Sequence, residues 1–370
     1  MDISATYICP LRGLAGLEPP DPERLGQAAK VSRDLGLTRL NLPVLEEALL
    51  KPVKEKVRYL DGLVRALDRA AEAKMPIALI APAQRLLGLE WVAPFLVRPV
   101  KAISAPKVFV DRKVRNLLPF DWWQDPGLLQ KRIALFRELA GAVSGHPAVT
   151  AWFLFDRFLE WSTPEAQQAD WLLKAFLAEL KERNNQAQTF LNLDWSALLD
   201  PDPIKTLVDQ VHGICLTGFD FWPQDLEPPA HEFLHGAFLG LLGQWIFKTS
   251  VELEIGWTLL GHAYDPQALM ESGSLLARQG VNGLNWLTLA DPTAGLHLDP
   301  PWNLNPDLAN LGLLDQALDP KTEWNAWFKQ WSSQKAGQNP FDFIDINVTA
   351  YLSDPKTHFN RLWEHFIDSQ

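Results

Sequence analysis

The stretch Thr249-Ser-Val-Glu-Leu-Glu-Ile-Gly-Trp257 indicates how this chain folds. Its apolar residues alternate with Glu252 and Glu254, which is the two-residue period of a β-strand. Gly256 ends the alternation and lets the backbone turn. Such a strand aims two carboxylates at one side of a sheet, and a buried carboxylate is costly unless it is paired or useful. We therefore predict that Glu254 is a catalytic carboxylate.

Seven further stretches have the pattern of strands, and helical stretches separate them along the chain. The predicted strands are 3–8, 38–43, 76–81, 149–155, 189–193, 213–218 and 281–289, with 249–255 as the seventh in chain order. Parallel neighbours need a crossover, so this alternation favours βαβ units, and eight of them close into a (β/α)8 TIM barrel. An open doubly wound sheet is the alternative, but no Gly-x-Gly-x-x-Gly follows the first strand. We predict the α/β barrel.

The chain after the eighth strand is rich in helical patterns. Trp324, Trp327 and Trp331 recur at helical spacing, and an amphipathic helix is expected near 359–366. We predict a barrel of catalytic type over residues 1–300. Residues 301–370 are expected to pack on it as part of the same domain, supplying the eighth helix and a cap.

Composition limits the partners of this 370-residue chain. Its 34 basic and 45 acidic residues give a net charge of −11, which argues against nucleic acid or an anionic membrane as the partner. No window supplies the roughly 20 apolar residues of a membrane span. The start has no basic region followed by an apolar run, so we expect no signal peptide and a cytoplasmic location. Cys9 and Cys215 lie in apolar strand-like runs and are expected to be reduced.

Candidate site residues follow the predicted strands, because a barrel carries its active site at the carboxyl ends of the strands. Glu254, Asp156 and Glu160 are the candidates for catalysis. The residues expected to bind substrate are Arg39, Asn41, Arg157, Asn192, Asp194, Asp220, Trp222, Glu252, Trp257, Asn285 and Trp286. Carboxylates, amides and indole faces suit polyol recognition, although 16 tryptophans are equally compatible with a bulky core.

Several short motifs, in this order, resemble a known family. They are Trp123-Gln-Asp-Pro126, His146-Pro-Ala-Val-Thr-Ala-Trp152, Gly218-Phe-Asp-Phe-Trp-Pro223, Leu253-Glu-Ile-Gly256 and Gly283-Leu-Asn-Trp286. Together they resemble clan A of the retaining glycoside hydrolases, the barrel enzymes that include cellulases, mannanases and β-galactosidases. The resemblance spans most of residues 1–300.

The resemblance implies a function and roles for particular residues. Glu254 would be the nucleophile of a double displacement on a β-linked oligo- or polysaccharide, and Trp286 would form the floor of a sugar subsite. The chemistry uses carboxylates alone, so no cofactor is implied. The expected partner is a carbohydrate.

One position departs from the family pattern. The clan ends its fourth strand with Asn-Glu, where the Glu is the acid/base, but this chain has Asp156-Arg157. Arginine stays protonated and cannot cycle a proton. Asp156 or Glu160 would then have to supply the second carboxyl group. Otherwise the barrel binds sugar without cleaving it, which is a separate hypothesis.

A third hypothesis comes from His231-Glu-Phe-Leu-His235, which matches H-E-x-x-H. On a helix the two histidines share one face and can bind zinc, with Glu232 as the general base of a metallopeptidase. Against this, Pro228 and Pro229 place His231 in the first helical turn. The barrel prediction also puts that helix on the outside.

Overall fold

The structure is a computed structural model. It describes residues 1–9, 17–86, 89–98, 107–111, 113–120, 122–158, 165–183, 186–217, 232–255, 266–300, 302–304, 309–334 and 340–369. Among the helices described, none has the length and apolarity needed to cross a membrane.

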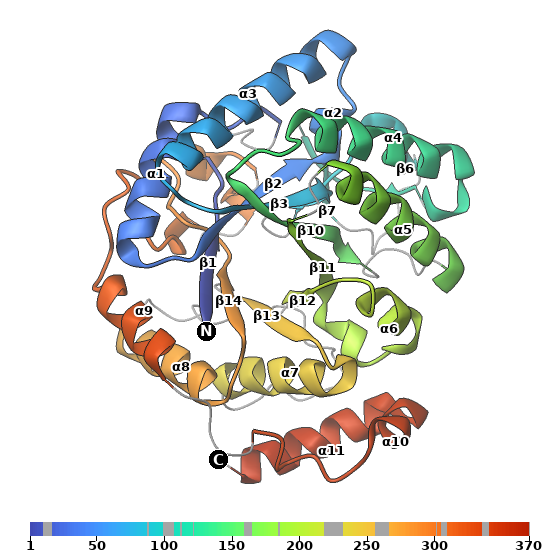
Figure 1. The fold of residues 1–370 in the computed structure, drawn as a ribbon, viewed down its shortest axis with the longest axis vertical. Helices are drawn as coiled ribbons and strands as arrows, with labels where there is room; N and C mark the ends of the chain where they lie inside the picture. The colour runs from blue at the N-terminus through green and yellow to red at the C-terminus, as the bar shows by residue number, and fades with distance from the viewer. Residues whose placement is uncertain are drawn as a thin grey trace.

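Eight parallel strands close into a barrel, which confirms the predicted (β/α)8 fold (Figure 1). Around the barrel they follow the order β1-β14-β13-β12-β11-β10-β3-β2. Their bounds are β1 Asp2–Thr6, β2 Arg39–Leu45, β3 Ile77–Ala83, β10 Val149–Phe158, β11 Gln188–Asp194, β12 Gly213–Thr217, β13 Ser250–Ile255 and β14 Gly283–Trp286. The stretch 250–255 is therefore the seventh barrel strand, and Glu254 lies near its carboxyl end.

Helices surround the barrel, and local sequence explains where they begin and end. The ring consists of α1 Pro22–Leu35, α3 Val53–Glu72, α4 Pro126–Ala142, α5 Ala166–Arg183, α6 Asp202–Val208, α7 Glu232–Phe247, α8 Pro266–Arg278 and α9 Trp324–Ser333. Asp21 caps α1 by accepting from the Arg24 amide, and Pro22 occupies the first turn. Gly36 ends α1 with a φ of 94°, a left-handed conformation that glycine adopts without steric cost.

The segment after β14 supplies the eighth helix, as the tryptophan spacing predicted. α9 contacts both α8 and α1, and so completes the ring. Two further helices, α10 Val348–Ser353 and α11 Pro355–Asp368, run outside α7 (Figure 1). Phe238 of α7 is fully buried and meets the rings of Phe359 and Trp363 on α11 at 5.1 and 5.3 Å. α7 is apolar around its circumference because it lies between the barrel and this layer.

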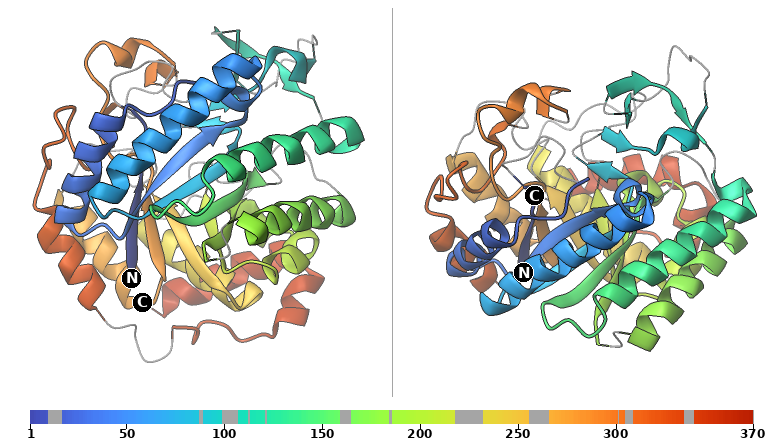
Figure 2. Two further views of the ribbon diagram at one scale, coloured as in Figure 1. Left: turned by 45° about the horizontal axis from the view of Figure 1, so that its top comes forward. Right: turned by 90° about the horizontal axis from the view of Figure 1, so that it is seen from above.

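The chain between β3 and α4 forms an insertion. Its sequence over 82–123 predicts an irregular segment with one strand at 107–110. That strand is present as β7 Lys107–Val110, but it belongs to a sheet with β4 Arg85–Leu86, β5 Leu89–Trp91 and β8 Lys113–Asn116. A second pair is formed by β6 Val97–Arg98 and β9 Leu118–Pro119. The insertion and the chain after β14 rise from the same side of the barrel (Figure 2).

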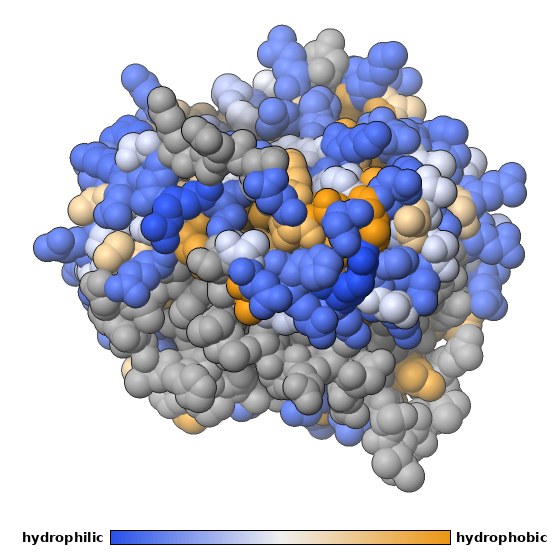
Figure 3. All heavy atoms as spheres, turned by 90° about the horizontal axis from the view of Figure 1, so that it is seen from below, coloured by the Kyte–Doolittle hydropathy of each residue, from blue (hydrophilic) through white to orange (hydrophobic). Residues whose placement is uncertain are grey.

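Few large apolar side chains are exposed on the described surface. In the view of Figure 3, hydrophilic residues dominate the described part of that face, and apolar residues form small separate patches. The exposed examples are Val53, Val57, Phe95, Leu118, Trp171 and Leu298. Scattered exposure of this kind is normal for a globular surface.

Candidate functional site

The centre of the barrel holds an ion pair. Arg39 on β2 donates from Nη2 to the carboxylate of Glu252 on β13, although β1 and β14 separate these two strands around the wall. The guanidinium also lies 5.0 Å from the ring centroid of Phe153 and 5.5 Å from that of Phe190. The side chains of Arg39 and Glu252 are only 9% and 5% exposed. The structure thus places these two predicted substrate-binding residues in contact with each other inside the barrel.

Glu254 lies two residues beyond Glu252 on the same strand, so its side chain faces the same side. Its Oε2 accepts from Asn285 Nδ2 at 3.4 Å, and Asn285 Oδ1 in turn accepts from the Thr6 hydroxyl at 3.4 Å. Asn285 is 2% exposed and Thr6 is 4% exposed, whereas Glu254 is half-buried. The carboxylate of Glu254 is therefore held from one side by a buried amide.

Asn41 connects the ion pair to the neighbouring strand. Its Oδ1 accepts from Arg39 Nε at 3.0 Å, and its Nδ2 donates to the Ser4 hydroxyl at 3.3 Å. The Ser4 hydroxyl donates to the carbonyl of Leu284 at 3.3 Å. The sequence analysis missed Ser4 and Thr6, although both lie on the first strand with the spacing that puts them on one face.

The two candidates on β11 have different surroundings. Asn192 is 4% exposed and lies two residues after Phe190, on the face that looks into the barrel. Asp194 accepts from the amide of Ser196 at 2.9 Å and so caps the short helix η3 Trp195–Leu198. The Asp194 carboxylate therefore has a structural partner in its own turn.

Asp156 and Arg157 lie within the last residues of β10, which runs three residues beyond its predicted end at 155; their side chains lie outside the described part of the structure. The pairing of the strand is irregular across these residues. Leu154 pairs with Leu191 and Phe158 with Leu193, so β10 has three residues where β11 has one. Phe155 has a φ of 58°, which is uncommon for a bulky residue. Such bulges often re-aim side chains beside active sites.

Several predicted residues lie outside the described part of the chain. They are Glu160, Asp220, Trp222, His231 and Trp257.

Trp286 points away from the barrel interior. It alternates with the inward Asn285, is 2% exposed, and donates from Nε1 to the carbonyl of Leu311 at 2.7 Å. Its ring also meets Trp324 on α9 edge to face at 5.4 Å. The structure thus gives Trp286 a packing role between β14 and the C-terminal segment, and does not bring it to Glu254.

This geometry predicts the behaviour of Trp286→Phe. The variant keeps an aromatic ring but leaves the buried carbonyl of Leu311 without its donor, which is expected to lower the free energy of unfolding by about 2 kcal/mol. Urea denaturation measures this loss. A variant of native stability that instead loses affinity for sugar would show that Trp286 forms a subsite floor.

His235, one of the two histidines in the zinc hypothesis, is buried in an aromatic cluster. It is 5% exposed, and its ring lies 6.1 Å from Trp195 and 5.6 Å from Trp363 on α11. Burial lowers the pKa of His235 to about 3, so the imidazole is neutral. Within the described ranges, no group of three or more His, Cys, Asp or Glu residues is arranged to hold a metal ion. The C-terminal helix α11 thus packs against His235, on the side where a zinc ion would need space.

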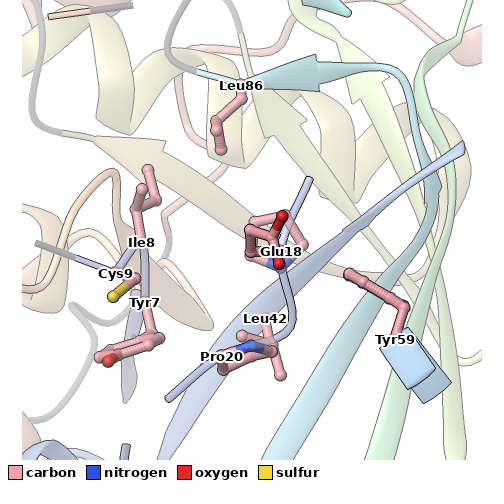
Figure 4. Close-up of a pocket in the computed structure, with 9 residues that line it drawn as sticks. Tyr7, Ile8, Cys9, Glu18, Pro20, Leu42, Tyr59 and Leu86 are labelled. Carbon is pink, nitrogen blue, oxygen red and sulfur yellow. The ribbon is translucent and has the colours of Figure 1, made fainter. Parts of the chain in front are cut away.

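A small pocket lies beside the ends of β1 and β2 (Figure 4). Tyr59 of α3 reaches toward Glu18 from one side, and Ile8 and Cys9 line the other (Figure 4). Leu42 and Leu86 add apolar walls. Leu42, which alternates with the inward Asn41, and Tyr59 of α3 place part of the lining between the barrel wall and the helices, while Pro43 lines it from the inward face of β2.

A second charged group anchors the loop after β2. Glu46 on the short helix α2 Glu46–Leu49 accepts from Arg132 Nη2 at 2.6 Å and from Gln84 Nε2 at 2.7 Å. Arg132 lies over the ring of Trp122, with its guanidinium carbon 3.2 Å from the centroid. Burial lowers the pKa of Arg132, and Glu46 opposes that shift. This pairing ties α2, α4 and the insertion together.

For Glu47, the next residue, the buried Oε2 meets no hydrogen-bond donor in the described part of the chain, and the titration of this carboxyl group gives a testable result. Burial raises the pKa of Glu47 to about 7, an effect that Lys51 reduces and Asp111 increases. The ordinary value is 4.5, so the native state holds an extra proton between pH 4.5 and 7, and stability falls as the pH rises through this window. Glu47→Gln is therefore expected to stabilise the protein at pH 8, by about 1 kcal/mol after solvent screening, and not at pH 4. Urea denaturation at both pH values checks this, and equal effects at both would contradict it.

No protein-family model matches the sequence, and neither does any curated protein. Solved structures do resemble it. A GH5_18 protein from Bifidobacterium longum subsp. longum, crystallised in complex with Manb1-4GlcNAc, is 15% identical, with a TM-score of 0.67 over 91% of this chain and 80% of that chain. A GH5_18 protein from Streptomyces cattleya, in complex with GlcNAc, is 14% identical, with a TM-score of 0.65 over 91% of this chain and 83% of that chain.

A third similar structure is an exo-beta-1,4-mannosidase from an Opitutaceae bacterium. It is 16% identical, with a TM-score of 0.65, and the match covers 90% of this chain but 59% of that chain. At these identities the likeness establishes the fold. This chain therefore has the barrel fold of the glycoside hydrolases that its motifs resemble.

Proposed function

We propose that this chain is a retaining β-glycoside hydrolase whose nucleophile is Glu254. The observation that carries the proposal is the setting of this carboxylate. It lies near the carboxyl end of a barrel strand, where barrel enzymes carry their active sites, and a buried Asn285 holds one of its oxygens. The solved barrels with the same fold include named glycoside hydrolases, which supports this choice of chemistry.

The chemistry follows from a carboxylate in this position. Glu254 attacks the anomeric carbon while a carboxylic acid protonates the leaving oxygen, and the same group then removes a proton from the water that releases the sugar. The second carboxyl group must lie about 5–5.5 Å from the first. Asp156 and Glu160 are the candidates, because Asp156 lies in the last residues of β10 and Glu160 follows that strand in the sequence.

Sugar binding would use amides and aromatic rings around the mouth. Asn41 and Asn192 face the barrel interior among the described residues. From the sequence we further propose the following contacts: Arg157, Asp220, Trp222 and Trp257. The sugars named for the similar structures, Manb1-4GlcNAc and GlcNAc, make β-mannosides the first substrates to test.

The test is hydrolysis of Manb1-4GlcNAc and of an aryl β-mannoside, followed by NMR of the anomeric proton. We expect release of sugar whose first-formed anomer is β, since double displacement retains configuration. A first-formed α-anomer would contradict the double displacement. The matched control is Glu364→Gln, a change on an exposed face of α11, which should leave the rate unchanged.

A sugar-binding barrel without hydrolysis is the second candidate. The observation that favours it is Arg157, which lies in the last residues of β10 where the resembled family carries its acid/base. The same preparation distinguishes the two functions by calorimetry. Saturable binding of Manb1-4GlcNAc with no release of sugar would support the binding function and exclude the hydrolase.

A further inference from the structure

We infer that Arg39 neutralises Glu252 beneath Glu254, so that this second carboxylate does not hold a proton on the nucleophile at working pH. This inference rests on the proposed function, and it assigns to the pair a positioning role. Neither residue is expected to touch the substrate, because each is occupied by the other inside the barrel.

The position of the pair is fixed by contacts from four strands. Arg39 reaches Glu252 across the interior and lies over Phe153 and Phe190. Its Nε donates to Asn41 at 3.0 Å, so the guanidinium cannot turn toward another acceptor without losing that bond. The charge of Arg39 is therefore held at one place below the site.

The strand next to Glu252 has a glycine, Gly283, beside the Glu252 side chain. A Cβ on Gly283 would lie 2.9 Å from Cγ of Glu252, so the neighbouring strand is bare where the carboxylate lies. Barrel interiors are usually filled by bulky apolar side chains. A buried ion pair is seldom more stabilising than apolar residues of similar volume. Stability alone thus gives no reason for a charged pair here, but where Glu252 is present its charge below Glu254 needs the balancing charge of Arg39.

The electrostatic argument concerns two carboxylates on one strand. Glu252 and Glu254 are two residues apart and face the same side, which puts them roughly 7 Å apart. At that separation, and at an effective dielectric constant of about 20, one unit charge moves a neighbour's titration by one to two pH units. An unpaired Glu252 would therefore hold the proton on Glu254, and Arg39 cancels that effect.

Other titratable groups occupy inward positions on several strands. Among the described residues they are the exposed Asp2 at the amino end of β1, Arg39 on β2, Asp194 on β11, Cys215 on β12, and Glu252 with Glu254 on β13. Asp194 is committed to the amide of Ser196. The inward positions of β1 and β14 beside Glu254 carry the neutral Thr6 and Asn285. Within the described part of the barrel wall, Arg39 and Glu252 are thus the charged pair that lies below Glu254 on the same inward face.

The experiment is a cycle of three variants: Glu252→Gln, Arg39→Gln and the double variant. The readout is the acid limb of the pH profile of kcat/KM on the aryl β-mannoside. In Glu252→Gln the positive charge of Arg39 is no longer balanced, so the midpoint of the acid limb should fall by about one pH unit. In Arg39→Gln the negative charge of Glu252 is no longer balanced, so the midpoint of the acid limb should rise by about one pH unit. The double variant should return to within about 0.3 units of the wild type, because the neutral pair restores the balance.

A second readout does not depend on turnover. In protein labelled with ¹³C at the glutamate carboxyl carbon, the resonance of Glu254 is identified as the one that Glu254→Gln removes, and its titration midpoint should shift as the limb does. Unshifted midpoints in all three variants would overturn the inference and leave the proposed function standing. Shifted midpoints in a protein without hydrolysis would support the inference and overturn the hydrolase. If Arg39→Gln does not fold, Glu252→Gln and the double variant decide the question alone.

Discussion

Glu254→Gln is expected to lower kcat/KM on the best β-glycoside by at least about 10³-fold, since removal of a nucleophile costs at least that much in comparable cases. Glutamine has nearly the same shape and can still meet Asn285, so the fold should be retained. What is lost is the negative charge that attacks the anomeric carbon. The measurement is steady-state kinetics on Manb1-4GlcNAc and an aryl β-mannoside, with circular dichroism as the check on folding.

Two glutamate variants serve as controls for this result. Glu364→Gln removes an exposed carboxylate on α11 and should have native kinetics. Glu252→Gln removes a carboxylate from the same strand, and it should shift the pH profile while retaining turnover. Full activity in Glu254→Gln would show that the carboxylate near the end of β13 is not the nucleophile.

Phe238→Ala is expected to lower the free energy of unfolding by about 4 kcal/mol, the middle of the range for a buried phenylalanine. Phe238 on α7 is 0% exposed and lies 5.8 Å from Phe343 and 5.7 Å from Phe366, beyond its contacts to Phe359 and Trp363. Loss of this ring leaves a cavity between α7 and α11, because four other rings have been packed around it.

Urea denaturation measures this effect, and Phe95→Ala is the matched control. Phe95 is 56% exposed, so the same change there should cost less than about 1 kcal/mol. A loss below about 1 kcal/mol for Phe238→Ala would show that the α10–α11 segment contributes little to the fold. In that case the apolar outer face of α7 would need another explanation.

Much of the fold followed from periodicity along the chain. The alternation at 250–255 and the helical patterns between strands depend on local sequence, so they predicted the elements and their order. The insertion was predicted less well. Strands of two or three residues, such as Arg85–Leu86 and Leu89–Trp91, are held by pairing with distant segments, and their local pattern is too short to recognise.

The positions of some site residues could be predicted from the sequence, and those of others could not. Strand alternation placed Glu254 near a strand end facing inward, and the same alternation turns Trp286 outward, which the motif resemblance had obscured. Asp194 precedes Ser196 in a pattern typical of helix caps, a signal that the sequence analysis overlooked. The pairing of Arg39 with Glu252 was out of reach, because it depends on the width of the closed barrel.

The measurement that tests the account most directly is the mass of the protein after incubation with a 2-deoxy-2-fluoro β-mannosyl fluoride, whose glycosyl-enzyme intermediate breaks down slowly. We predict one covalently bound sugar per chain, located by peptide mapping at Glu254 and missing from Glu254→Gln. A sugar attached to another carboxylate, or slow turnover with no adduct on any peptide, would contradict the assignment of Glu254 as the nucleophile.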